Sequence, residues 1–180
     1  LPLLLLSSLR PASADQFDTL DGKVLAGILR SKDLKTAPGI TSNEIAGLPA
    51  LFKESRAALL FVKTGSGNFA RLLVTPELRK HADGKGDPFP VLVVERYDTF
   101  DGSNPGQRVA RGRDLMLFDG FQFDLDSGQV VPPGEGGDLL FAVKGEKSPR
   151  LSTIGESRML SPAKLPVPEA GAPPQPTPGR

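Results

Sequence analysis

An acidic stretch in the second half of the chain contains the residues best suited to hold a metal ion. Residues 114–143 include six carboxylates and no lysine or arginine. Calcium prefers several oxygen ligands, and the segment DLDSG (124–128) places two aspartates on one face of a strand before a glycine turn. Counted as an EF-hand loop from Asp124, Asp126 stands at position 3 and Glu135 at position 12. The sequence therefore indicates Asp124, Asp126 and Glu135 as candidate calcium ligands.

The same stretch has a plainer interpretation that the sequence leaves open. An EF-hand loop has its glycine at position 6 and a helix on either side, whereas Gly128 falls at position 5 and its surroundings indicate strands. The alternative is a solvated strand face that ends in an acidic turn. Calcium is thus one hypothesis, and the sequence indicates no other cofactor.

Acid–base catalysis by two carboxylates is a further hypothesis, because a glycosidase-type pair is defined by its separation in space rather than along the chain. Either Asp98 with Asp101 or Asp124 with Asp126 could supply the acid and the base. The chain has no tryptophan and one tyrosine, although sugar sites commonly use exposed aromatic rings. His81 is the only histidine, which excludes a histidine-rich metal centre, and its polar neighbours indicate an exposed loop.

Three arginines form a second candidate surface: Arg108, Arg111 and Arg113. A guanidinium can bind a carboxylate or sulfate through two parallel hydrogen bonds, and Arg111 and Arg113 would share one face of a strand. The alternative is an edge strand protected by its charges. Over the whole chain, 22 Lys and Arg balance 21 Asp and Glu, which argues against nucleic acid as a partner.

The elements that must position these residues are mainly strands. Two short helices are indicated as well, over 41–55 by the capping box of Thr41 and Glu44, and over 75–82 by Thr75 before a proline. The expected fold is a β-rich antiparallel sandwich or partly open barrel with one or two short helices. Apolar runs predict strands at 57–63, 69–74, 90–97, 113–118, 121–126 and 138–143, the first two joined as a hairpin by TGSGN.

One segment is echoed later in the chain. FDTLDG followed by KVLAG (17–27) resembles YDTFDG (97–102) followed by RVARG (108–112) once SNPGQ is removed. Each copy has an aromatic residue, an Asp-Gly pair suited to a turn, and a valine that could begin a strand. We therefore expect a repeated aromatic-turn-strand unit, with a pair of matched ligand sites as the alternative.

Both ends of the sequence differ from the middle. Residues 1–14 look like the remnant of a signal peptide cleaved after Ala14, with an apolar run too short to cross a bilayer. Residues 161–180 contain seven prolines and predict a disordered tail. A single domain is expected over 15–160, and without cysteine it has no disulfide.

These patterns favour an exported protein, periplasmic or extracellular, that acts as a non-catalytic binding or structural module. Its partner would be a protein or a polymer of the cell envelope, without nucleic acid or a transmembrane segment. The alternatives are a small carboxylate-based, glycosidase-like hydrolase and a calcium-stabilised domain.

Overall fold

The computed structural model describes residues 16–30, 35–48, 57–143 and 148–160. The predicted signal peptide remnant at 1–14 and the predicted proline-rich tail at 161–180 lie outside these residues.

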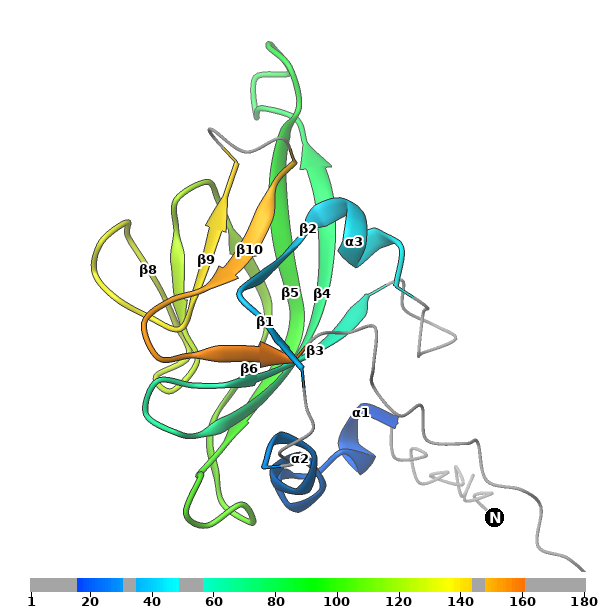
Figure 1. Ribbon diagram of the computed structural model, residues 1–180. Helices are drawn as coiled ribbons and strands as arrows, with labels where there is room; N and C mark the ends of the chain where they lie inside the picture. Colours follow the sequence, from blue (N-terminus) through cyan, green and yellow to red (C-terminus); the bar gives the residue numbers. More distant parts are fainter. Residues whose placement is uncertain (1–15, 31–34, 49–56, 144–147, 161–180) are drawn as a thin grey trace, which may run out of the picture.

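Two antiparallel sheets pack face to face in a β-sandwich (Figure 1). The six-stranded sheet has the order β1 (Thr36–Ala37), β11 (Arg158–Leu160), β3 (Ala58–Lys63), β4 (Phe69–Arg79), β5 (Phe89–Phe100) and β6 (Arg108–Leu117). The five-stranded sheet has the order β2 (Gly39–Thr41), β10 (Arg150–Thr153), β9 (Leu139–Ala142), β7 (Gln122–Asp124) and β8 (Gln129–Val131). In the described part of the chain the sheets share no strand, so the fold is the expected β-rich sandwich and not a closed barrel.

Each of the six predicted strands overlaps an observed strand: β3, β4, β5, β6, β7 and β9. β7 covers only part of the predicted range 121–126, and Asp126 lies in the turn after it, so the prediction that Asp124 and Asp126 share one face of a strand was wrong. The predicted hairpin is confirmed too, because β3 pairs with β4 in antiparallel register from Ala58 opposite Val74 to Lys63 opposite Phe69. Gly67 in its turn has a φ of 88°, a left-handed conformation that glycine adopts without strain.

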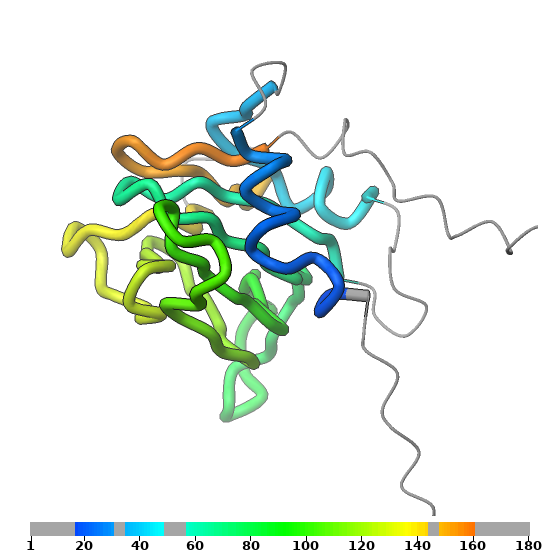
Figure 2. The backbone as a smooth tube through the Cα atoms, turned by 90° about the horizontal axis from the view of Figure 1, so that it is seen from below, coloured from blue at the N-terminus to red at the C-terminus, as the bar shows by residue number. Residues whose placement is uncertain are grey.

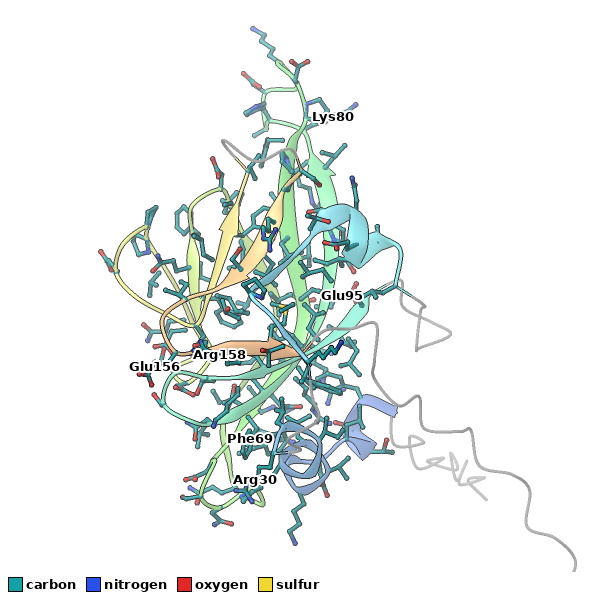
Figure 3. The ribbon with its side chains drawn as sticks, viewed as in Figure 1. Arg30, Phe69, Lys80, Glu95, Glu156 and Arg158 are labelled. Atoms are coloured by element: carbon teal, nitrogen blue, oxygen red, sulfur yellow. The ribbon has the colours of Figure 1, made fainter. Side chains whose placement is uncertain are left out.

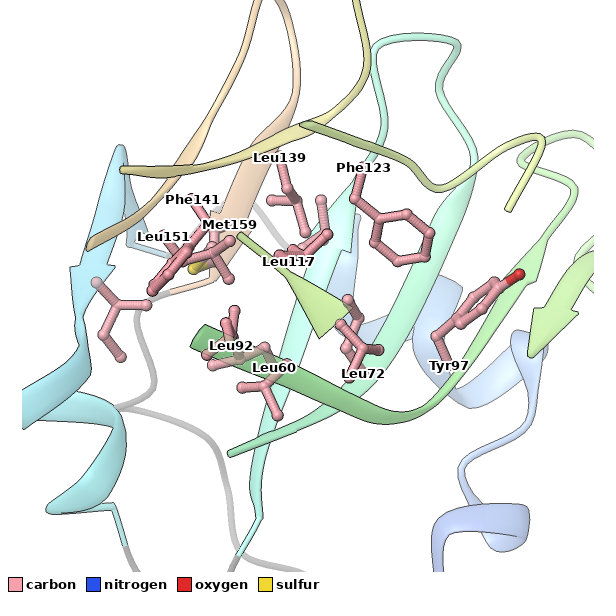
Figure 4. Close-up of a cluster of buried hydrophobic side chains, with 14 of the residues drawn as sticks. Leu60, Leu72, Leu92, Tyr97, Leu117, Phe123, Leu139, Phe141, Leu151 and Met159 are labelled. Atoms are coloured by element: carbon pink, nitrogen blue, oxygen red, sulfur yellow. The ribbon is translucent and has the colours of Figure 1, made fainter. Parts of the chain in front are cut away.

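A core of aliphatic and aromatic side chains lies between the two sheets (Figure 4). Alternate residues of β3, such as Leu60 and Val62, point into it, as the period of two along a strand requires. From the five-stranded sheet, Phe123, Phe141 and Leu151 meet them, all fully buried. Burial of this kind contributes about 25 cal/mol per Å² of apolar area and holds the sheets together.

A second core lies on the opposite, outer face of the six-stranded sheet. Two helices, α1 (Gln16–Thr19) and α2 (Gly22–Leu29), cover this face. The other residues of β3, Leu59 and Phe61, pack there against Phe17 and Leu25. The continuous apolar run of β3 is therefore explained by burial on both faces.

The echoed segment does not form a repeated aromatic-turn-strand unit, so that prediction was wrong. Its first copy forms α1 and α2, whereas its second copy ends β5 and begins β6. The Asp-Gly pairs do behave alike, since Asp21 Oδ1 accepts hydrogen bonds from two amides downstream in the chain and Asp101 Oδ1 does the same. In the first copy those amides open a helix, and Leu25 of that helix is buried on the sheet.

The two copies also touch each other. A Cβ placed on Gly22 would lie 1.9 Å from the carbonyl oxygen of Pro105 and 2.6 Å from the ring of Phe100. Figure 2 shows α2 running beside the loop between β5 and β6. The absence of a side chain at Gly22 therefore allows α2 to pack against Phe100 and Pro105 of the second copy and the loop after it.

The two helix predictions had different outcomes. The capping box is confirmed at α3 (Ser42–Ala46), where Thr41 accepts from the Glu44 amide and Glu44 accepts from the Thr41 amide. Residues 49–56, the rest of that prediction, lie outside the described residues.

The helix predicted over 75–82 was wrong, because β4 continues through Arg79 in register with β5. An N-cap contributes only about 1 kcal/mol, which a ladder of long-range backbone hydrogen bonds outweighs. Pairing between β3 and β4 ends at Val74, so Pro76 stands where β4 has one strand neighbour and its missing N–H can face the open side.

Candidate functional site

The acidic stretch brings three carboxylates together, though not the three that were predicted. Oxygens of Asp124, Asp126 and Asp138 lie within 4.8 Å of one another. Glu135 is exposed in the turn between β8 and β9 and does not belong to this group. Asp138 belongs to the same acidic stretch, but its distance from DLDSG along the sequence gave no signal that it would join the cluster.

Protein donors already engage each of these carboxylates. Asp138 is buried and accepts from the amides of Gly65 and Leu125 and from the hydroxyl of Ser157, at 2.7–2.9 Å. It thereby ties the turn between β3 and β4 to the end of β7 and to the turn before β11.

The other two members of the cluster make turn contacts. Asp124 accepts from the amides of Asp126 and Ser127 and from the Ser127 hydroxyl, and so closes the turn that leads into β8. Asp126 accepts from the side-chain amide of Asn68 at 2.9 Å. A cation bound here would have to compete with, or reorient, these donors.

The other predicted carboxylate pair is also engaged in the structure. Asp98 is buried on the outer face of β5, where its Oδ1 lies 2.9 Å from Arg108 Nε. Asp101 is exposed and accepts from the hydroxyl and amide of Ser103 and from the amide of Asn104. These hydrogen bonds lower the pKa of Asp101, which suits a turn acceptor better than a general acid.

A pocket of about 270 Å³ lies on the outer face of β5 and β6, beside α1. It is called the arginine pocket here, and its walls are Arg96, Tyr97, Asp98, Arg111, Gly112 and Arg113. The register explains how it forms, because Arg96 stands directly opposite Arg113 and Asp98 directly opposite Arg111. Side chains opposite each other in two antiparallel strands share a face.

The arginines around the pocket differ in what they contact. Arg96 pairs with Asp18 and lies over the Phe17 ring, 4.5 Å from its centroid. Arg113 is 76% exposed and comes only within 3.9 Å of Asp114. For Arg111, which is exposed, the described part of the chain provides no hydrogen-bond or ion-pair partner.

Arg71 lies beneath this surface and was missed by sequence reasoning. It is fully buried, donates to the carbonyl oxygens of Phe17 and Leu20, and forms a 2.5 Å ion pair with Asp98. Burial lowers the pKa of Arg71, and the hydrogen bond and charge of Asp98 oppose that change. A single arginine inside the apolar run FARLLV was the available signal, since a buried charge requires a partner.

The remaining candidates are peripheral. His81 is exposed just after β4, as predicted, with its ring 4.9 Å from the ring of Phe89. Among the helices that the structure describes, none has the length and apolar character needed to cross a membrane.

No protein-family model, curated protein or solved structure matches this chain.

Proposed function

We propose that this protein is an exported, non-catalytic binding module that captures a partner bearing carboxylates or sulfates at the arginine pocket. The observation that carries the proposal is the pair of exposed guanidinium groups of Arg111 and Arg113 on one face of β6, at the rim of a pocket. Export is supported by the signal-like pattern of residues 1–14.

Local charge supports an anionic partner. Five arginines of β4, β5 and β6 lie in or beside the pocket: Arg71, Arg96, Arg108, Arg111 and Arg113. The buried Asp98 is already shared by Arg71 and Arg108. Asp18 faces Arg96 and Arg71. The pocket therefore keeps a positive excess that the near-neutral net charge of the chain conceals.

The test is binding of the full chain to polyglutamate and to polygalacturonate by isothermal titration calorimetry. We expect the double variant Arg111→Gln/Arg113→Gln to bind about tenfold more weakly than the wild type, because two charge-assisted contacts are removed. Added salt should weaken wild-type binding, since the contacts are exposed.

A matched control removes the same charge elsewhere. The double variant Lys80→Gln/Lys85→Gln changes two lysines in the exposed loop between β4 and β5. Lys80 lies at the end of the molecule opposite α1 and α2 (Figure 3). This variant should bind like the wild type. Equal losses in both double variants would show that the net charge, and not the pocket, controls binding.

Calcium stabilisation stays a prediction, favoured by the three clustered carboxylates and opposed by the donors that engage them. Melting in excess EDTA and then in excess calcium tests it, because a cation that binds only the folded state raises the melting temperature. A rise that Asp126→Asn abolishes would support the cation site, and loss of the response in Glu135→Gln would support the ligand set predicted from the sequence.

A carboxylate-based hydrolase also stays a prediction. Asp98 lies between two guanidinium groups and Asp101 closes a turn, so neither is poised as a proton donor. Turnover of a polysaccharide that Asp124→Asn/Asp126→Asn abolishes, with the fold intact, would establish the enzyme.

A further inference from the structure

The free edge of β6 borders the arginine pocket. β6 is the last strand of the six-stranded sheet and pairs with β5 alone. Within the described residues, no other segment hydrogen-bonds to its backbone. Asp114 has a φ of 57°, and this left-handed residue breaks the alternation of β6 between Arg113 and Leu115. Over residues 110–113, before the break, alternate amides and carbonyls face outward, ready to pair with another extended chain.

We propose that the anionic partner is an extended acidic polypeptide that adds to the edge of β6 as a further strand; this inference rests on the proposed function. A strand placed beside β6 would have its side chains next to those of β6 on each face of the sheet, about 5 Å away. On the outer face these neighbours are Arg111 and Arg113. On the inner face they are Ala110 and Leu115, which pack against the core between the sheets.

The two faces of β6 specify a sequence pattern in the partner. Carboxylates at two alternate positions would meet Arg111 and Arg113, and an apolar side chain at a neighbouring position would continue the core beyond Ala110. Leu115 faces the core as well because the left-handed backbone at Asp114 shifts the alternation by one residue. The preferred ligand therefore alternates acidic and apolar residues. The regular stretch of the edge, residues 110–113, spans about 14 Å.

A second copy of this chain does not fit the same edge. Antiparallel pairing of two β6 edges centred on Gly112 would place Arg111 of one copy opposite Arg113 of the other, and like charges directly opposite each other destabilise a sheet. The charges that discourage self-association thus select an acidic partner.

The probe is a capped decapeptide of alternating glutamate and valine, titrated into the full chain. Two modified peptides test backbone pairing. One is N-methylated at every glutamate and the other at every valine. Because successive amides of a strand point to opposite edges, each peptide lacks the N–H donors of one edge and keeps its charge and side chains. Polygalacturonate serves as an anionic polymer that cannot form a strand. Hydrogen–deuterium exchange of β6 is followed in each complex.

We expect the decapeptide to bind, to slow amide exchange in β6, and to lose about tenfold in affinity both with Arg111→Gln/Arg113→Gln and in the N-methylated version that blocks the paired edge. If both N-methylated peptides bind as well as the parent, strand addition is wrong while anion capture stands. Tighter binding of polygalacturonate without protection of β6 would identify a polysaccharide partner instead. If the arginine variant binds every probe like the wild type, the proposed function fails as well.

Discussion

Arg71 on β4 and Asp98 on β5 form a buried ion pair, with Nη2 and Oδ2 2.5 Å apart and both side chains no more than 2% exposed. The residues stand directly opposite each other in the sheet. Arg71 also donates to the carbonyl oxygens of Phe17 in α1 and of Leu20 just after it, and lies 4.0 Å from the centroid of the Phe17 ring. This pair thus fastens α1 to the sheet and supports the floor of the arginine pocket.

Asp98→Asn should destabilise the fold by about 3–5 kcal/mol, because it leaves the buried guanidinium of Arg71 without its counter-charge. Urea unfolding followed by circular dichroism measures the change. Asp18→Asn is the matched control: Asp18 faces the same arginine from the surface, is 42% exposed, and should cost less than about 1 kcal/mol. Equal losses would show that the pair is not the stabilising contact.

Gly112→Ala should destabilise the protein by about 1–3 kcal/mol through overpacking. A Cβ at Gly112 would lie 2.6 Å from Cε1 of Tyr97, whose ring also packs edge-on against Phe123. Thermal and urea unfolding test this. Gly27→Ala is the contrasting control, since Gly27 lies within α2 with open space around it, and alanine there should stabilise by about 0.5–1 kcal/mol.

Tyr97 should make the fold sensitive to alkaline pH. Burial raises its pKa above the ordinary 10.0, and the nearby Asp98 charge adds to the effect. The unfolded chain therefore releases this proton first, so the contribution of Tyr97 to stability is complete below pH 10.0 and is lost as pH rises through the native pKa.

Tyr97 is the only tyrosine, so ultraviolet absorbance of tyrosinate reports its titration directly. We expect a higher midpoint in buffer than in concentrated urea, and a smaller alkaline loss of stability in Tyr97→Phe. Identical midpoints in buffer and urea would contradict the prediction.

Asp138→Asn should cost about 1–3 kcal/mol, because the introduced amide would direct a donor at groups that are themselves donors, among them the amides of Gly65 and Leu125. Glu135→Gln, in the exposed turn nearby, should change stability by less than about 0.5 kcal/mol. Urea unfolding measures the free energy of unfolding of both variants. A larger loss in Glu135→Gln than in Asp138→Asn would contradict the prediction.

The strands and the turns between them were predictable because their signals are local. Apolar runs and glycine-rich connections located β3, β4 and β5, and the capping box located α3. The helix expected at Thr75 failed since its signals were equally local but weaker than pairing with β5. The extent of β4 depends on a partner strand that the local pattern does not contain.

The candidate sites were likewise predictable in part, where the signal is local to the sequence. The sequence indicated that Asp124, Asp126 and the arginines of β6 could bind ligands, because residue type and strand period are properties of the sequence itself. It did not indicate that Asp138, and not Glu135, would complete the acidic cluster.

By itself, the sequence determined a disulfide-free β-rich chain whose two echoed Asp-Gly pairs bind the backbone amides that follow them. Only the tertiary structure decided that one echoed copy forms parts of two helices and the other parts of two strands, and that Arg71 meets Asp98. The physical reason is that strand order and register arise from many weak contacts between distant residues, and they determine which side chains meet.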